Sequence, residues 1–165
     1  MEGFTTKKQQ FATVWKMHTA GDAQWYPAQV PGTVYTDLLR NGQMEDPFWK
    51  DKEYRALDLM EKDYEYETVF EGTEAQEGER QWLRFEGLDT ICDIYLNEEE
   101  IGNTYNMHRT WEFDVTGKVK AGENILRVYF HSPLEYIKEA YEKQPTHGSD
   151  DAMDGFVHIR KAHCM

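Results

Sequence analysis

Cysteine and basic residues are scarce in this chain, and it has no long apolar run. Its two cysteines in 165 residues are too few for the disulfide framework of a small secreted domain. Eighteen Lys and Arg stand against 31 Asp and Glu, a net charge of −13, so the basic surface that nucleic acids and anionic membranes need is not expected. No run approaches the roughly 20 apolar residues of a membrane-spanning helix, and residues 1–10 carry no apolar signal core. We therefore expect a soluble, cytoplasmic protein that binds neither nucleic acids nor membranes.

Catalytic signatures are missing as well. The sequence has no Gly-rich phosphate loop and no Gly-x-Ser-x-Gly nucleophile elbow. Acidic residues are so numerous, including the run Glu98–Glu100, that close pairs arise by chance, and none is marked as a general acid and base. We interpret Glu98–Glu100 as an exposed hairpin turn, and we predict no catalytic residue and no cofactor in this chain.

An acidic loop near the C-terminus, Gly148–Gly155, has part of a calcium-binding pattern. Asp150 and Asp154 match positions one and five of an EF-hand loop. Position three is Ala152 and position twelve is Lys161, where calcium requires a bidentate Glu. The pattern favours a solvated acidic loop over a calcium site.

The last residues read as a strand, Phe156–Arg160, followed by an abrupt end at Met165. His158, His163 and Cys164 lack the further ligands that a zinc site needs, so no metal is expected there. Because domain ends are usually polar and loose, this end inside patterned sequence indicates a chain that continues further.

Aromatic residues are abundant, at 14% of the chain, with ten Tyr, eight Phe and five Trp. Strands accommodate such side chains well. The rings belong either to a hydrophobic core or to faces on which sugar rings stack.

Period-two alternation of apolar and polar residues marks five segments, each of which predicts a strand with one buried face. They are Tyr64–Phe70, Leu83–Glu86, Cys92–Leu96, Trp111–Val115 and Leu126–Phe130. Turn signals rather than long helices separate them, which predicts one mostly β domain over residues 1–165, an antiparallel sandwich or barrel. Cys92 is expected to be a buried thiol.

Two short helices are predicted beside the strands. Thr33 can cap a helix that runs to Leu39 and stops at Gly42. Ser132 and Glu135 have the spacing of a capping box at the start of a second helix, which ends near Lys143.

The segment Asn106–Arg109 is the most informative loop. It lies between a probable strand and the strand that begins at Thr110. Arg offers donors in a fixed fork, and Asn both donates and accepts, so Asn106 and Arg109 can bind sugar hydroxyls. Equally, the loop can be stabilised by its own side chains, and spacing alone does not decide between the two.

Several short motifs follow one another in a familiar order, and together they cover almost the whole chain. They are Val30–Val34, Asp37–Leu39, Glu45–Phe48, Phe85–Thr90, Tyr95–Asn97, Asn106–Arg109, Phe113–Val115, Gly122–Leu126, Ser132–Pro133 and Arg160–Lys161. The series resembles the N-terminal sugar-binding domain of β-mannosidases of glycoside hydrolase family 2. It is similar, more distantly, to the matching domain of β-galactosidases and β-glucuronidases.

The resemblance implies a jelly-roll β-sandwich of the galactose-binding-domain type. It also implies a longer retaining exo-β-mannosidase, whose catalytic glutamates lie in a downstream barrel of the same chain and whose ligand is a terminal β-mannoside. Asn106 and Arg109 match the family loop that approaches the sugar. Tyr64, and Leu57 or Leu59, stand where the family usually has Trp. A free-standing carbohydrate-binding module and a sandwich used only for protein contacts are the other readings.

Overall fold

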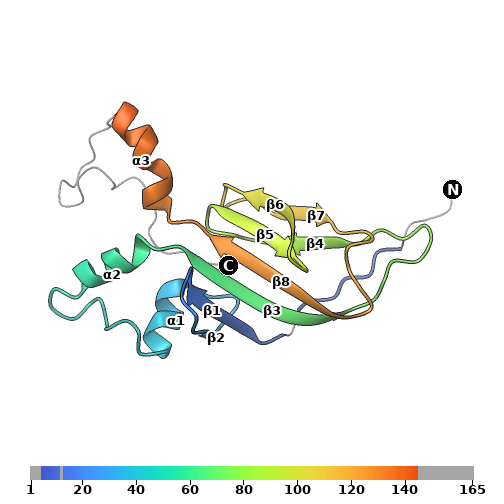
Figure 1. Ribbon diagram of the computed structural model, residues 1–165, viewed down its shortest axis with the longest axis horizontal. Helices are drawn as coiled ribbons and strands as arrows, with labels where there is room; N and C mark the ends of the chain where they lie inside the picture. Colours follow the sequence, from blue (N-terminus) through green and yellow to red (C-terminus); the bar gives the residue numbers. More distant parts are fainter. Residues whose placement is uncertain (1–4, 12, 145–165) are drawn as a thin grey trace.

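The computed structural model describes residues 5–11 and 13–144 and shows two antiparallel sheets with three helices at one end (Figure 1). A six-stranded sheet has the order β2-β1-β3-β8-β5-β6, and a two-stranded sheet pairs β4 with β7. The strands of the large sheet are β1 (Trp15–Thr19), β2 (Tyr26–Ala28), β3 (Tyr64–Gly72), β5 (Cys92–Leu96), β6 (Glu99–Thr104) and β8 (Gly122–Phe130). The small sheet consists of β4 (Trp82–Phe85) and β7 (Trp111–Asp114), and the helices are α1 (Val34–Arg40), α2 (Glu53–Met60) and α3 (Pro133–Lys143). The predicted mostly β, antiparallel sandwich is confirmed.

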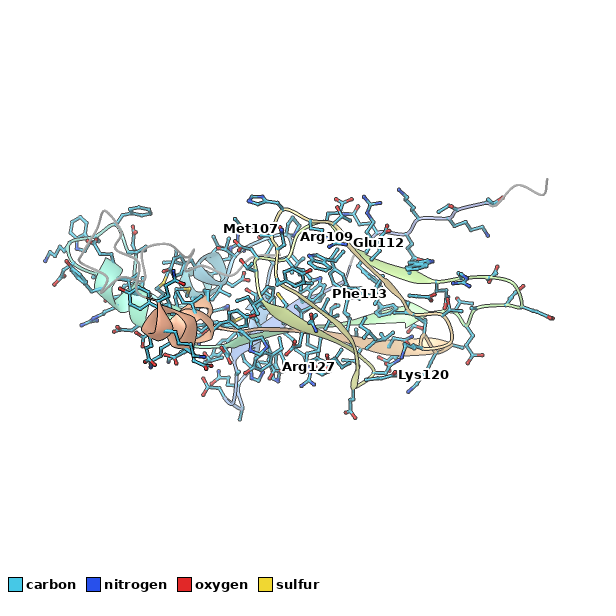
Figure 2. The ribbon with its side chains drawn as sticks, turned by 90° about the horizontal axis from the view of Figure 1, so that it is seen from above. Met107, Arg109, Glu112, Phe113, Lys120 and Arg127 are labelled. Atoms are coloured by element: carbon cyan, nitrogen blue, oxygen red, sulfur yellow. The ribbon has the colours of Figure 1, made fainter. Side chains whose placement is uncertain are left out.

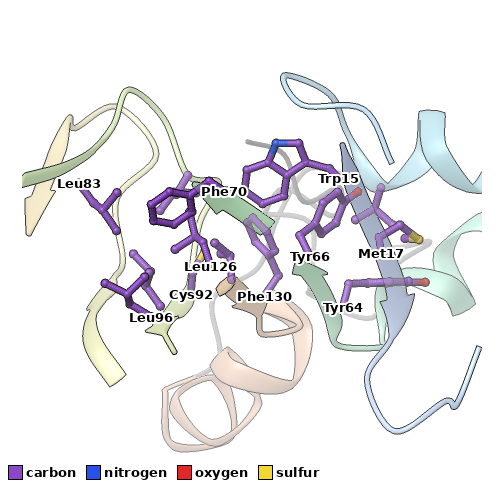
Figure 3. Close-up of a cluster of buried hydrophobic side chains, with 14 of the residues drawn as sticks. Trp15, Met17, Tyr64, Tyr66, Phe70, Leu83, Cys92, Leu96, Leu126 and Phe130 are labelled. Carbon is purple, nitrogen blue, oxygen red and sulfur yellow. The ribbon is translucent and has the colours of Figure 1, made fainter. Parts of the chain in front are cut away.

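The core lies between the two sheets and follows the alternation read from the sequence. On β3, Tyr64, Tyr66, Thr68 and Phe70 are buried, whereas Glu65, Glu67 and Val69 between them are more exposed. Figure 3 shows Leu83 of β4 beside Leu96 and other buried side chains of the large sheet, in the same cluster. The thiol of Cys92 is fully buried, as expected. One shared core therefore holds the two sheets together.

The opposite face of the large sheet is covered by paired charges. Lys16 lies 2.7 Å from Glu67, and Arg127 lies 3.2 Å from Glu65 and stacks over the ring of Tyr95 at 4.6 Å. An antiparallel sheet with one apolar and one charged face is buried on one side only.

Helix α1 has the predicted ends. Thr33 and Thr36 form a capping box, and the chain turns away at Gly42, which has a φ of 68°. Glycine adopts this left-handed conformation without steric cost, so the helix stops there.

The predicted capping box of α3 is wrong in one respect. The N–H of Ser132 donates to Asp63 at 2.6 Å, so Asp63 takes the place that Glu135 would have. The hydroxyl of Ser132 donates to the carbonyl of Met60 at 2.9 Å. The start of α3 is therefore fixed by tertiary contacts, which no local spacing reveals.

Strands β1, β2 and β6 and helix α2 were not expected from the pattern. In particular, Glu99 and Glu100 belong to β6, and the turn before them is at Asn97 and Glu98, with φ values of 52° and 70°. The interpretation of Glu98–Glu100 as a turn is thus correct for Glu98 alone. An edge strand can carry charged side chains because its outer face meets water.

Several predictions fall on the C-terminal segment. The acidic loop Gly148–Gly155, the strand-like run Phe156–Arg160 and Cys164 lie outside the described residues. Over residues 5–11 and 13–144, no helix has the length and apolar character to cross a membrane.

Asp37 connects α1 to the large sheet. Its side chain, 1% exposed, accepts hydrogen bonds from the hydroxyl of Tyr66 at 2.9 Å and from the N–H of Gln29 at 3.1 Å. Arg40 lies 3.4 Å from the same carboxylate. Burial raises the pKa of Asp37 above its ordinary value of 3.8, although these hydrogen bonds oppose the shift.

At Gly102 of β6 the two sheets come into close contact, because glycine has no side chain to keep them apart. A Cβ built on it would lie 2.2 Å from Cε1 of Phe113 on β7. The phenyl ring of Phe113 therefore rests directly on the backbone of β6, and this contact sets the position of β7 against the large sheet.

We expect Asp37→Ala to lower the free energy of unfolding by about 2–4 kcal/mol, because it removes the acceptor of two hydrogen bonds, one from the buried hydroxyl of Tyr66 and one from the N–H of Gln29. Asp37→Asn keeps an acceptor oxygen and should cost less than about 1.5 kcal/mol.

The raised pKa of Asp37 also predicts a pH dependence of stability. Because this pKa is higher in the folded state, the folded protein binds the proton of the Asp37 carboxyl more tightly, so stability falls as pH rises through that pKa. Urea titrations at about pH 4 and about pH 7 should therefore show wild type losing stability relative to Asp37→Asn as the pH rises. A wild-type protein that gains stability relative to Asp37→Asn as the pH rises would contradict this account.

Gly102→Ala should destabilise the domain by about 1–3 kcal/mol, the usual cost of overpacking a core contact. Gly87→Ala is the matched control, since its Cβ would lie 3.8 Å from the nearest atom outside its chain neighbours, the carbonyl oxygen of Met107. Equal urea midpoints for the two variants would show that the contact between Gly102 and Phe113 does not hold the sheets together.

Candidate functional site

The candidate site is the loop of residues 105–110, which runs from β6 of the large sheet to β7 of the small sheet. Figure 2 shows Met107 and Arg109 at one edge of the molecule, with Arg127 on the opposite side. Gly102 on β6 and Phe113 on β7 lie on either side of the loop in the sequence, and their contact brings the two ends of the loop close together. The position of the loop is thus set by the packing of the two sheets.

Asn106 shapes this loop from within. Its side-chain Oδ1 accepts a hydrogen bond from the N–H of His108 at 2.9 Å, which closes an Asx-type turn. Its backbone carbonyl accepts from the indole Nε1–H of Trp111 at 3.0 Å. Within the described chain its amide nitrogen makes no hydrogen bond, so one polar group of Asn106 is still available to a ligand.

Arg109 is held in place by an aromatic row. Its guanidinium lies 4.6 Å from the centroid of the Trp111 ring, a cation–π contact. The Trp111 ring in turn meets Tyr105 edge-on at 5.3 Å and lies parallel to Phe113 at 6.4 Å. The cation–π contact holds the guanidinium over the Trp111 ring in the absence of a ligand.

Arg109 also differs from the other described arginines in its ionic contacts. Each of the other five lies within 4.0 Å of a carboxylate: Arg40, Arg55, Arg80, Arg84 and Arg127. Among residues 5–11 and 13–144, Arg109 forms no ion pair, although the chain has 31 acidic residues. Its exposed donors can therefore bind oxygen atoms of a ligand.

Carboxylates near β7 have structural partners instead. Hydrogen bonds from Thr116 hold the pKa of Asp114 below its ordinary value, and Arg80 at 3.3 Å contributes further. Asp114 is therefore an ionised surface residue rather than a proton donor. In the part of the chain that the structure describes, no three His, Cys, Asp or Glu side chains are grouped so as to hold a metal ion.

The sequence placed Asn106 and Arg109 in one loop, and the structure does bring them together with Trp111. What the sequence missed is the aromatic support formed by Tyr105, Trp111 and Phe113. The alternation at 111 and 113 marked those two residues as core, but it did not show that the Trp111 ring would lie under Arg109. Sugar contact by Asn106 and Arg109 stays a prediction.

A family model described as the glycosyl hydrolase 2 galactose-binding domain-like domain matches residues 15–165. The chain belongs to this family. The match covers the core, the candidate loop and all three helices, so the resemblance found in the short motifs is confirmed.

Relatives and solved structures agree with this assignment. The chain is 34% identical to a β-mannosidase of Capra hircus over 161 residues, which cover 91% of this chain and 18% of the goat protein. It is 33% identical to a Bos taurus β-mannosidase, with 98% and 20% covered. A crystal structure of a Dictyoglomus thermophilum β-D-mannosidase superimposes with a TM-score of 0.76 and 36% identity, over 83% of this chain and 17% of that one. The chain thus spans about a fifth of the length of the two mammalian relatives.

The turn at Asn106 makes a testable prediction. Asn106→Ala removes the acceptor of the His108 amide, worth about 0.5–1.5 kcal/mol, so exchange of that amide should accelerate roughly 2- to 12-fold. Asn106→Asp keeps the oxygen and should leave the rate close to wild type. Amide hydrogen exchange resolved at His108 measures both, and equal rates in wild type and Asn106→Ala would contradict the proposed role of Asn106 in the turn.

Proposed function

We propose that this chain is the non-catalytic N-terminal domain of a retaining exo-β-mannosidase. In this proposal the loop of residues 105–110 forms part of the wall of the pocket for the terminal sugar. Its support is the family membership together with the β-mannosidase relatives that match nearly all of the chain. Hydrolysis itself would use two carboxyl groups of the downstream barrel, about 5 Å apart, one as nucleophile and one as acid/base.

One observation carries the sugar-binding part of the proposal: the guanidinium of Arg109 lies over Trp111 and, among the described residues, has no carboxylate partner. In an acidic protein an exposed arginine normally finds a carboxylate, as the other described arginines do. A guanidinium that is stacked and left without a carboxylate keeps its donors for neutral hydroxyl oxygens, which is what a sugar presents. The amide nitrogen of Asn106 lies in the same loop and adds a second donor.

The exposed ring of Tyr105 favours a second candidate, sugar binding by the domain alone. Tyr105 is 64% exposed and borders the same loop, so its face can stack on a sugar. A free-standing module of this kind would bind mannosides without a downstream barrel. The coding sequence beyond Met165 separates the two candidates directly.

The kinetic test uses the complete enzyme. A hydrogen bond to a charged group is worth about 1.5–3 kcal/mol, so Arg109→Ala should lower kcat/KM for a β-mannoside roughly 10- to 150-fold. Asn106→Ala should also lower kcat/KM, either by losing a contact or by loosening the loop. Arg80→Ala is the control, because Arg80 is an exposed residue just before β4. It pairs with Asp114, at the end of β7 that is farther from the loop.

Thermal melts on each variant separate direct contact from folding. The proposal expects Arg109→Ala to keep the wild-type melting temperature while kcat/KM falls, and Arg80→Ala to keep both. If Arg109→Ala and Asn106→Ala retain wild-type kcat/KM and melting, the loop takes no part in the pocket.

A further inference from the structure

The segment between α1 and α2, together with the first turn of α2, presents large apolar side chains to water. Phe48 is 95% exposed, and Trp49 and Tyr54 are each 61% exposed. We call residues 45–55 the aromatic loop. Single exposed apolar residues are ordinary on a protein surface, but three within seven positions form a feature that folding does not explain.

Hydrogen bonds and ion pairs connect the polar residues of the aromatic loop with one another. The side chain of Asp46 accepts a hydrogen bond from the N–H of Phe48 at 3.0 Å. The backbone carbonyl of Asp46 accepts a second one from the N–H of Trp49 at 3.1 Å. Glu45 pairs with Lys52 at 2.6 Å and with Arg55 at 3.1 Å, which ties the start of the loop to its end. The polar side chains of the loop are thus engaged with one another, while its aromatic ones face outward.

Helix α2 fixes this loop to the body of the domain. Ala56 and Met60 are buried in the core, and the hydroxyl of Tyr35 on α1 donates to the carbonyl of Ala56 at 3.3 Å. The side chains that anchor α2 are therefore separate from those that the aromatic loop displays.

The exposed apolar residues concentrate at the helical end. Of the ten exposed large hydrophobic residues in the part of the chain that the structure describes, five lie on α1, α3 or the aromatic loop: Leu39, Phe48, Trp49, Tyr54 and Tyr136. The outer face of the large sheet carries ion pairs, for example Lys16 with Glu67, and its exposed apolar side chains, Val69 and Ile125, are aliphatic and 41% exposed. This contrast distinguishes a surface suited to a protein partner from one suited to water.

We infer that the aromatic loop is the surface on which the remainder of the same enzyme chain docks. The inference rests on the proposed function, because it requires a longer chain. The β-mannosidase relatives have about four-fifths of their length outside the matched region. Helix α3, the last described element, lies at the same end of the molecule as α1 and α2 (Figures 1 and 2). Buried aromatic anchors with a polar rim are typical of such interfaces, and Glu45, Lys52 and Arg55 supply the rim.

Hydroxyl-radical footprinting of the full-length enzyme tests this directly, and the chain has an internal standard. Trp82 on the outer face of β4 is 53% exposed, close to the 61% of Trp49. If the interface excludes water from Trp49, its oxidation should be about fivefold or more slower than that of Trp82. Oxidation of Trp49 as fast as that of Trp82 would overturn the inference.

Paired variants check the same point without labelling. Phe48→Ser combined with Trp49→Ser should make the full-length enzyme more susceptible to proteolysis between this domain and the rest of the chain, whereas Trp82→Ser should leave the pattern unchanged. An unchanged pattern in the double variant would count against docking at this loop.

The outcome is distinguishable from failure of the proposed function. β-Mannoside hydrolysis is measured on the same wild-type sample. An active enzyme in which Trp49 is oxidised rapidly refutes the docking inference and leaves the proposed function standing. An inactive enzyme in which Trp49 is protected refutes the proposed substrate and leaves docking standing. Protection that appears only with added mannooligosaccharide, or only at high protein concentration, would identify a sugar platform or a self-association surface and overturn the inference.

Discussion

The antiparallel pairing of β3 with β8 is the constraint on which the other elements depend. The two nine-residue strands pair along their full length, from Tyr64 opposite Phe130 to Gly72 opposite Gly122. Asp63 locks one end by accepting from the N–H of Ser132 at 2.6 Å and the hydroxyl of Tyr129 at 2.7 Å. A slip of one residue would turn every core side chain toward water, so the register is strongly specified.

Asn124 locks the other end of this pair. It is fully buried, its Nδ2 donates to the carbonyl of Lys120 at 2.8 Å, and its Oδ1 accepts from the side chain of Asn97 at 2.9 Å. A Cβ on Gly72 would lie 2.5 Å from that Nδ2, so glycine is required there. Because β5 pairs with β8 and β6 with β5, this register carries through to the start of the candidate loop. Arg109 is thus positioned by a chain of contacts that begins in the centre of the sheet.

Local pattern predicted those parts of the fold that alternate cleanly between a buried and an exposed face. The segments that became β3, β4, β5, β7 and β8 each have that alternation, and Thr33 and Gly42 marked α1 with local chemistry alone. β1 does not alternate, because the neighbouring residues Met17 and His18 are both buried. The ring of His18 stacks on that of Trp25, with centroids 3.8 Å apart. Lys52 makes no side-chain cap for α2, so no start signal marked that helix.

The candidate site shows the same division between local and tertiary information. A polar loop between two strands marked Asn106 and Arg109, because the turn and the donors are local features. The aromatic support of Arg109 depends on the way in which β7 lies against β6, and the absence of an ion pair depends on where the acids lie in space. Neither can be read from spacing along the chain.

The central claim is that the packing of two sheets holds Arg109 ready for a sugar in the complete enzyme. A crystal structure of that enzyme with a β-mannoside or a non-hydrolysed analogue in its pocket tests this most directly. The account predicts the guanidinium of Arg109 still stacked on Trp111 and within about 3.2 Å of a hydroxyl of the terminal sugar. A complex in which this loop faces solvent, with the sugar held by other residues alone, would contradict it.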